Sequence, residues 1–223
     1  MGERTTVEVV VNKGETREAS LDRQSYFSDS YFTLPQLFSL SHQIEKINKL
    51  APRDILEIGI GNGFTSSFLR RAGYDVMTAD INPALEPDIC APLSELEEHL
   101  NGRRFDLVVC CEVLEHMPFN EFCTNIRILS KLGDRLFMTL PNCKKYFGFG
   151  GLVRIPKLGY KVLGVYISSR ILKSVPEEHF WELGSSRDTS LDEIIRNLRD
   201  IYSKVYTGRF AMNPYHQYFI AEN

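Results

Sequence analysis

Short apolar runs alternate with amphipathic stretches through the middle of the chain. Aliphatic runs of this length are typical of buried strands, and they lie at Ile55–Ile58, Asp75–Ala79, Leu107–Cys111 and Leu136–Leu140. Stretches with helical spacing lie between or beside them, at Thr65–Ala72, Ser94–Leu100 and Asn120–Ser130. With a further short strand expected near Asp88, the alternation predicts an α/β fold with a doubly wound, mostly parallel sheet.

The pattern is less regular toward the two ends. Val7–Val11 predicts a short hairpin or edge strand, residues 25–38 an irregular segment, and Ser41–Leu50 a helix that stops before Pro52. Near the other end, Ser190 and Glu193 form a capping box for a helix. The residues that this helix is expected to bury are Ile194, Ile195, Leu198 and Ile201. The two final strands are predicted at Val205–Phe210 and Gln217–Ala221.

The turn after the first predicted strand carries the most specific chemistry. Glycines at 59, 61 and 63 allow a tight turn whose N–H groups approach a ligand closely. Phe64 stands where a dinucleotide fingerprint needs its third glycine, and Glu57 would repel a pyrophosphate but suit an ammonium group. Asp80 ends the second strand, where an acid commonly binds both ribose hydroxyls. The turn therefore predicts a nucleoside with an amino-acid tail and no phosphate.

Three motifs in this order resemble the class I S-adenosylmethionine-dependent methyltransferases, in the group of small-molecule and ubiquinone-type enzymes. They are EIGIGNG, TADINP and FDLVVCCEVLEHMP, which lie between Asp54 and Pro141. The resemblance implies a Rossmann-like sheet of seven strands that ends in an antiparallel hairpin. It also implies one methyltransferase domain over residues 1–223, with an N-terminal extension at 1–50 and a lid-like insert at 142–189.

The same resemblance implies S-adenosylmethionine as the cofactor and residues that bind it. The implied contacts are Glu57, Gly59, Gly61, Gly63, Asp80, Ile81 and Glu112. Many relatives bind the adenine through an acid after the third strand, whereas this chain has PDICAPL there. Two alternatives stay open for that contact: the carboxylate of Asp88, or backbone atoms of residues 90–92 beginning with Cys90.

The sulfonium cofactor makes its methyl group electrophilic, so the protein has to hold a nucleophile in line and remove its proton. His116 and His179 are the candidate catalytic bases, because an unperturbed imidazole titrates near neutrality. The alternative for His116 is a cap of the loop before Pro118. Glu115 is expected to be solvated, and Trp181 either walls the acceptor pocket or packs the insert down.

Composition indicates the cellular location of the protein but not its acceptor. The lack of an apolar signal core argues against secretion, and no apolar run is long enough for a membrane-spanning helix. The cysteine usage is simplest in a reducing cytoplasm. The five cysteines have no C-x-x-C spacing, and no metal-ligand cluster is evident in the sequence. Gly2 and Thr6 fit a loose myristoylation pattern, for which chance is the simpler explanation.

The insert carries the hint about the acceptor. Residues 142–176 hold seven basic residues and no acid, interleaved with aromatic and aliphatic side chains. Such a surface suits an anionic, lipid-linked or glycan-linked small molecule, or peripheral contact with a membrane. A solvated basic loop is the alternative, and nucleic acid is disfavoured because the chain as a whole is acidic.

Two rival functions remain at this point. A catalytically idle partner protein that binds S-adenosylmethionine would use the same Glu57, glycines and Asp80. A nicotinamide-dependent oxidoreductase is disfavoured by Phe64 and Glu57. The sequence leaves the methylated atom and the oligomeric state open.

Overall fold

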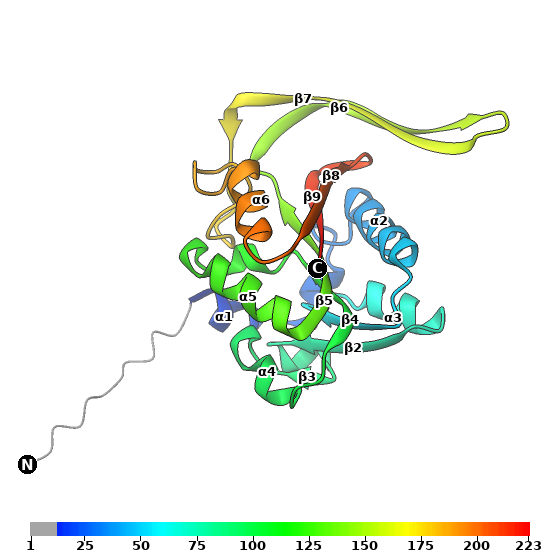
Figure 1. The fold of residues 1–223 in the computed structure, drawn as a ribbon. Coiled ribbons are helices and arrows are strands. Elements are labelled where there is room, and N and C mark those ends of the chain that lie inside the picture. Colours follow the sequence, from blue (N-terminus) through cyan, green and yellow to red (C-terminus); the bar gives the residue numbers. More distant parts are fainter. Residues whose placement is uncertain (1–12) are drawn as a thin grey trace, which may run out of the picture.

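Residues 13–223 are described by the structure, a computed structural model (Figure 1). The predictions for Gly2, Thr6 and Val7–Val11 lie outside these residues. The helices are α1 (Lys13–Glu18), α2 (Leu34–Leu50), α3 (Phe64–Arg71), α4 (Leu96–His99), α5 (Phe122–Leu132) and α6 (Leu191–Arg199). Among the described residues, no helix is both long enough and apolar enough to cross a bilayer.

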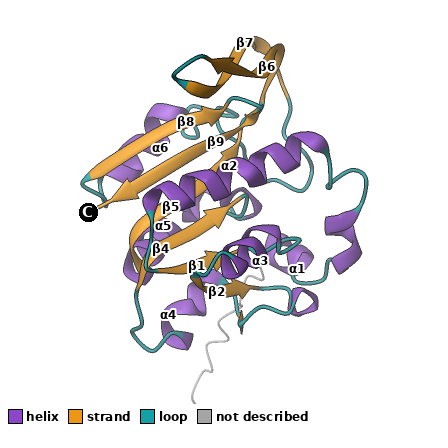
Figure 2. Cartoon of the chain, turned by 90° about the vertical axis from the view of Figure 1, so that its right-hand side faces the viewer, coloured by secondary structure: helices purple, strands orange, loops and turns teal. Residues whose placement is uncertain are grey.

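One sheet forms the centre of the molecule (Figure 2). Within residues 13–223 its seven strands run in the order β3-β2-β1-β4-β5-β9-β8, in which β9 is antiparallel to both β5 and β8 and the other neighbouring strands are parallel. Their bounds are β1 (Asp54–Ile58), β2 (Asp75–Asp80), β3 (Ile89–Cys90), β4 (Phe105–Cys111), β5 (Gly133–Pro141), β8 (Lys204–Phe210) and β9 (Asn213–Glu222). The predicted doubly wound sheet with a closing hairpin is therefore confirmed.

The strand order places a binding site before any side chain is considered. The chain steps outward from β1 to β2 and β3 and then returns to β4, on the other side of β1. The connections therefore diverge above the carboxyl ends of β1 and β4, which leaves a crevice there. The glycine turn leaves β1 and the EVLEH segment leaves β4 at this point.

Two apolar cores lie on opposite faces of the sheet. On one face, helices α4, α5 and α6 pack through Leu96, Ile126 and Leu198, which are fully buried. On the other, α2 and α3 pack through Ile47 and Leu69. These layers fix both faces of the sheet, so the crevice has a rigid floor.

The predicted boundaries hold within a few residues in the core but fail before it. α2 begins at Leu34, seven residues ahead of the predicted start, because Thr33 caps its first turn and Pro35 fits the first helical positions. Ala51, in the left-handed conformation, ends α2 where expected. Ser190 caps α6, as the capping box predicts.

The insert contains a long two-stranded ribbon. β6 (Lys144–Ile155) and β7 (Gly159–Lys173) pair only with each other among the described strands. Figure 1 shows the ribbon passing over the β8–β9 edge of the sheet and extending beyond α2. Its role as a lid stays a prediction.

Candidate functional site

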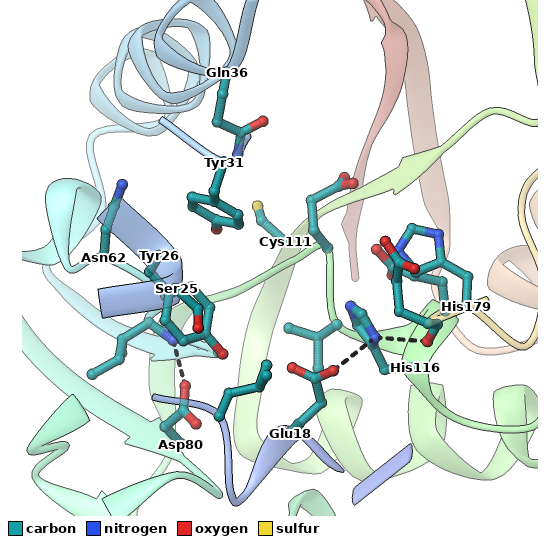
Figure 3. A pocket seen from close by; sticks show the side chains of 18 of the residues that line it. Glu18, Ser25, Tyr26, Tyr31, Gln36, Asn62, Asp80, Cys111, His116 and His179 are labelled. Atoms are coloured by element: carbon teal, nitrogen blue, oxygen red, sulfur yellow. Dashed lines mark hydrogen bonds and ion pairs between the residues drawn. The ribbon is translucent and has the colours of Figure 1, made fainter. Parts of the chain in front are cut away.

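A cavity of about 910 Å³ opens at the carboxyl edge of the sheet. Its floor is the glycine turn after β1, the loop after β2 and the segment after β4. Residues 14–36 cover it from one side, and the start of β9 closes another. Figure 3 shows Asn62 and Asp80 at one end of the cavity and His116 and His179 at the other.

The glycine turn has the shape that its sequence predicts. Gly59 and Gly61 have φ angles of 77° and 50°, in the left-handed region. A Cβ on Gly59 would lie 2.3 Å from Cγ2 of Val113, so no side chain fits there. Both glycines line the cavity, whereas Gly63 caps α3 and does not number among the described lining residues.

Asp80 joins the two loops that form the cofactor end of the cavity. Its carboxylate accepts hydrogen bonds from the N–H groups of Ile60 at 2.8 Å and Asn82 at 2.9 Å. Each carboxylate oxygen has a further lone pair, and the half-buried side chain borders the cavity together with Ile81. Asp80 therefore fixes the turn and can still accept hydrogen bonds from a diol.

Glu57 lies beneath the turn, almost fully buried. Among the described residues its Oε2 has no hydrogen-bond partner, although it borders the cavity. Burial raises the pKa of Glu57 to about 7. A buried carboxyl group in this state favours a cationic ligand, because an ammonium group would both supply its missing partner and ionise it.

The two alternatives for the adenine contact differ in position. Asp88 accepts hydrogen bonds from the N–H and hydroxyl of Thr78, both at 2.8 Å, and pairs with Arg70. This carboxylate holds the sheet edge together and is not among the described residues that line the cavity, so its assignment as a cofactor contact is not supported. Cys90 is also outside the lining set, with an exposed side chain. Ala91, Pro92 and Leu93 border the cavity instead.

Glu112 stands at the end of β4 in a strained backbone conformation. Its φ of 56° is uncommon for a residue with a side chain, and the position is held by a 3.2 Å hydrogen bond from its N–H to the carbonyl of Thr139. The carboxylate faces the cavity and lies 3.2 Å from Nε2 of buried His216. The turn thus directs an acid and an imidazole toward one point.

Glu115, His116 and His179 form a cluster at the end of the cavity away from Asp80. One ligand atom of each lies within 4.8 Å of the others, and the two imidazole rings are 4.9 Å apart. His116 Nδ1 is 3.2 Å from the carbonyl of Glu178 and 3.3 Å from Glu18 (Figure 3). The structure thus brings together two candidate bases that are separated by a ribbon in the sequence.

The interpretation of Glu115 as a solvated residue is wrong. Its side chain is fully buried, and outside Glu115 itself its two oxygens have no hydrogen-bond partner among the described residues. Burial and the neighbouring Glu112 raise its pKa well above the ordinary value. Such a group needs a proton or a cation beside it, since an unpaired buried charge is very costly.

No metal site is evident along the sequence, yet this cluster offers the ligands for one. Burial and the neighbouring His179 lower the pKa of His116 to about 4, so its imidazole is neutral at physiological pH. A neutral imidazole beside a carboxylate is a common donor set for transition-metal ions. Glu115, His116 and His179 could therefore hold a divalent cation.

Several lining residues were missed in the sequence. Glu18, Tyr26 and Tyr31 come from the segment before α2, while Tyr215 and His216 come from β9. The repeated SYF sequence at residues 25–27 and 30–32 is the only hint that the first segment contacts a ligand. Its aromatic residues do not follow a helix or strand period, so they are not expected to be core residues. Nothing around Tyr215 distinguishes it from an ordinary strand residue.

Trp181 packs the insert against the body instead of walling the cavity. Its indole N–H donates to the carbonyl of Met117 at 3.0 Å, and its ring meets Phe119 and Phe122 edge-on. It is 3% exposed. In the same segment, Nδ1 of His179 lies 2.9 Å from Oε1 of Glu182 and forms a hydrogen bond with it. Trp181 therefore anchors the segment that positions this histidine.

Comparison with known proteins agrees with this geometry. Residues 34–137 match the family model of a methyltransferase domain. The chain is similar to the ubiquinone biosynthesis O-methyltransferase of Rickettsia bellii, with 26% identity over 82% of this chain and 84% of the relative. It is 30% identical to the enzyme of the same name from Aliivibrio fischeri, over 53% and 58% of the two chains.

Solved structures share the fold. The magnesium protoporphyrin IX methyltransferase of Synechocystis with bound SAM has a TM-score of 0.60 and 17% identity, over 94% of this chain and 97% of that one. A glycopeptide N-methyltransferase in complex with S-adenosyl-L-homocysteine has a TM-score of 0.52 and 12% identity, over 82% and 89%.

Proposed function

We propose that this chain, as a class I S-adenosylmethionine-dependent methyltransferase, methylates a lipid-linked small molecule at the histidine end of the cavity. The observation that carries the proposal is one continuous cavity. It joins the glycine turn and Asp80 to His116 and His179. A cofactor and an acceptor can therefore meet inside it without leaving the protein.

The residues present fit S-adenosylmethionine. The proposed contacts are Glu57 to the ammonium group, Asp80 to the ribose hydroxyls and the backbone of residues 91–93 to the adenine. Gly59 and Gly61 allow the tight turn, because a Cβ would meet Val113 at the first position and Tyr31 at the second. When bound, the cofactor supplies an electrophilic methyl group.

The protein's own part is to hold the acceptor and accept its proton. His116 is neutral, and its Nδ1 is engaged by Glu178 and Glu18, which leaves Nε2 as the atom to receive a proton. His179 is positioned by Glu182, whose Oε1 also accepts a hydrogen bond from Tyr215. We propose that His116 is the base and that His179 orients the acceptor.

A divalent cation is the second possibility for this cluster. Glu115, His116 and His179 would hold it, and it would lower the pKa of a bound hydroxyl group. The two buried and unpartnered oxygens of Glu115 favour this arrangement. In that case the histidines are ligands, and Glu112, held beside His216 at the cavity wall, is the candidate base.

The charge of the cavity bears on the choice of acceptor. Among the described residues, Arg17 is the one lysine or arginine that lines it, against seven acids. An anionic group would be repelled there, so we favour a neutral hydroxyl on a lipid-linked acceptor over an anionic one. The relatives named for ubiquinone biosynthesis are O-methyltransferases, which agrees with a hydroxyl nucleophile. Action in the cytoplasm, with peripheral membrane contact through residues 142–176, is part of the same proposal.

Calorimetry tests the cofactor site. We expect wild-type protein to bind S-adenosylhomocysteine and not NAD, and Asp80→Ala to weaken binding by about 1–3 kcal/mol because hydrogen bonds go unmade. Asp75→Ala, which removes an exposed carboxylate from the same strand, is the matched control and should bind like wild type. Tight NAD binding, or equal Kd values for the two variants, would contradict the assignment.

Mass spectrometry tests the catalytic part. Membrane lipid extracts incubated with the protein and S-adenosylmethionine should contain a compound heavier by one methylene unit. His116→Ala should abolish this gain while S-adenosylhomocysteine still binds. If His116→Ala keeps full activity, neither role proposed for His116 holds.

A further inference from the structure

The β6–β7 ribbon has two different faces. Residues opposite each other in an antiparallel ladder share a face, and alternate residues point to opposite sides. Tyr146, Gly148 and Gly150 thus lie on one face with their partners Ser168, Tyr166 and Gly164. The other face carries two direct pairs, Phe147 with Ile167 and Phe149 with Val165.

The first face packs on the body of the protein. The hydroxyl of Tyr166 donates to the carbonyl of Ala211, in the turn between β8 and β9. A Cβ on Gly150 would lie 2.4 Å from that same oxygen, so the glycine lets the ribbon approach. Arg209 adds a hydrogen bond to Ser168 at 3.2 Å. This face therefore fixes the direction in which the other face points.

The second face is apolar and uncovered. The exposed fractions are 83% for Phe147, 73% for Ile167, 69% for Phe149 and 61% for Val165. Leu163 and Val153 continue the strip toward the tip, which carries exposed Leu158. An isolated two-stranded ribbon is marginally stable in water, and an apolar strip of this length marks an interaction surface.

The charges around the strip indicate its partner. Lys145, Arg154, Lys157 and Lys161 are exposed on the ribbon, and residues 142–176 contain no acid. The remaining chain is strongly acidic, because the net charge of the whole is still −3. An anionic surface would therefore attract the ribbon and repel the body, so that the ribbon alone makes contact.

The ribbon also connects to the cavity. Tyr146, at the base of β6, lines the cavity and packs edge-on against Tyr166, which is anchored to Ala211. The segment after β7 contributes His179. A surface bound by the ribbon would thus lie next to the acceptor end of the cavity.

We propose that the outer face of the ribbon, made by Phe147, Phe149, Val165 and Ile167, binds an anionic phospholipid bilayer. The apolar side chains enter the interface and the flanking basic residues contact lipid phosphates. This inference rests on the proposed function for its purpose, because a bilayer is where a lipid-linked acceptor would be found.

Cosedimentation of the full chain with vesicles tests it. We expect binding to vesicles of phosphatidylcholine with phosphatidylglycerol, weaker binding to phosphatidylcholine alone, and a decrease with added salt. The variant F147S/F149S/I167S should lower the bound fraction by at least about tenfold. The control F68S/L191S/Y206S removes three exposed apolar side chains elsewhere and should bind like wild type.

A charge variant and calorimetry separate the outcomes. K145E/K161E should lose binding to anionic vesicles and keep the weak binding to neutral ones. All variants should bind S-adenosylhomocysteine with the wild-type Kd. If neither wild type nor any variant binds it, the proposed function is contradicted, but the result of the vesicle experiment still applies. The inference is overturned if the wild type does not bind anionic vesicles, or if F147S/F149S/I167S binds them as well as the wild type does. It is also overturned if wild type forms a dimer that this variant dissociates while vesicles have no effect, because the outer face would then join two copies.

Discussion

At the scale of single residues, the site depends on carboxyl groups in surroundings that do not suit a negative charge. Glu57 and Glu115 are both buried and have unpartnered oxygens, and burial raises the pKa of each. A carboxyl group kept in this state is costly to the fold, so a ligand that supplies positive charge repays the cost on binding. The two groups differ in position: Glu57 lies at the glycine turn and Glu115 beside the histidines.

Replacing Glu57 tests its role through pH. Since its pKa is about 7 in the free protein, binding of an ammonium group at lower pH requires loss of a proton. The affinity for S-adenosylhomocysteine should therefore fall by up to roughly tenfold per pH unit below pH 7 and level off above it. Glu57→Gln should bind more weakly at pH 8 and lose this pH dependence. Calorimetry between pH 5 and 8 measures both, and Glu45→Gln on α2 is the control with an exposed glutamate.

The same group makes a prediction about stability. A raised carboxyl pKa in the folded state means that protonated Glu57 favours folding below its unfolded pKa of 4.5, and that this contribution is lost as pH rises through about 7. Without ligand, the wild type should lose about 3 kcal/mol more free energy of unfolding than Glu57→Gln between pH 4.5 and 7.5. Urea unfolding of the two proteins at both pH values measures the difference, and parallel curves would contradict it.

Removal of metal tests the cluster around Glu115. If Glu115, His116 and His179 bind a divalent cation, dialysis against a chelator should abolish methyl transfer. The affinity for S-adenosylhomocysteine should stay unchanged, because the proposed cofactor contacts lie at the other end of the cavity. Elemental analysis should find metal in wild type and in Glu98→Gln, and little in Glu115→Gln. Full activity of the metal-free protein would leave His116 as the base.

At the scale of elements, local capping chemistry decides where helices begin and end. Thr33 starts α2 and Ser190 starts α6, each by accepting a hydrogen bond from the N–H three residues on. The capping box at Ser190 was evident in the sequence, and Thr33 was overlooked because aromatic and turn residues precede it. The longer α2 matters, since its first turn lines the cavity through Pro35 and Gln36.

Loss of the cap on α6 should have a moderate effect on stability. Ser190→Ala leaves the N–H of Glu193 without its acceptor and should lower the free energy of unfolding by about 1 kcal/mol. Ser94→Ala, at an exposed serine, should change it by less than about 0.5 kcal/mol. Urea unfolding measures both, and equal values would show that Ser190 does not support the helix.

At the scale of the whole molecule, the sheet and the ribbon are separate structures. The sheet has a core on each face, whereas the ribbon pairs with itself and contacts the body through the turn at Ala211, which meets Gly150 and Tyr166. The protein therefore resembles a rigid cofactor-binding body with an arm. Trp181 and Glu182 hold the return segment, so the arm and His179 share one anchor.

Shortening the arm should separate its role from that of the body. Replacing residues 149–165 with an Asn-Gly turn keeps the pair Gly148–Tyr166 and the contact of Tyr166 with Ala211. We expect a Tm within about 4 °C of wild type and an unchanged affinity for S-adenosylhomocysteine, because both cores remain. Vesicle binding should be lost. A collapse of cofactor binding would show that the arm is part of the body's fold.

The sequence by itself determined the fold class, the glycine turn and the positions of Glu57 and Asp80. Hydrophobic period, glycine spacing and caps act over a few neighbouring residues, so they can be read along the chain. The histidine end of the cavity could not be predicted from the sequence, because the burial of its side chains depends on the packing of distant segments. Glu115 is buried next to a segment far along the chain, where the N–H of Phe180 donates to its carbonyl, and nothing in the local sequence indicates that burial.

The ribbon shows the same division. Its basic composition was evident, but the sequence did not tell which side chains are covered. The ladder register and the turn at Ala211 decide that, since they place Gly150 against the body and Phe147 in solvent. Tertiary structure alone sets which face of an element meets water, because that depends on what the rest of the chain brings to the other face.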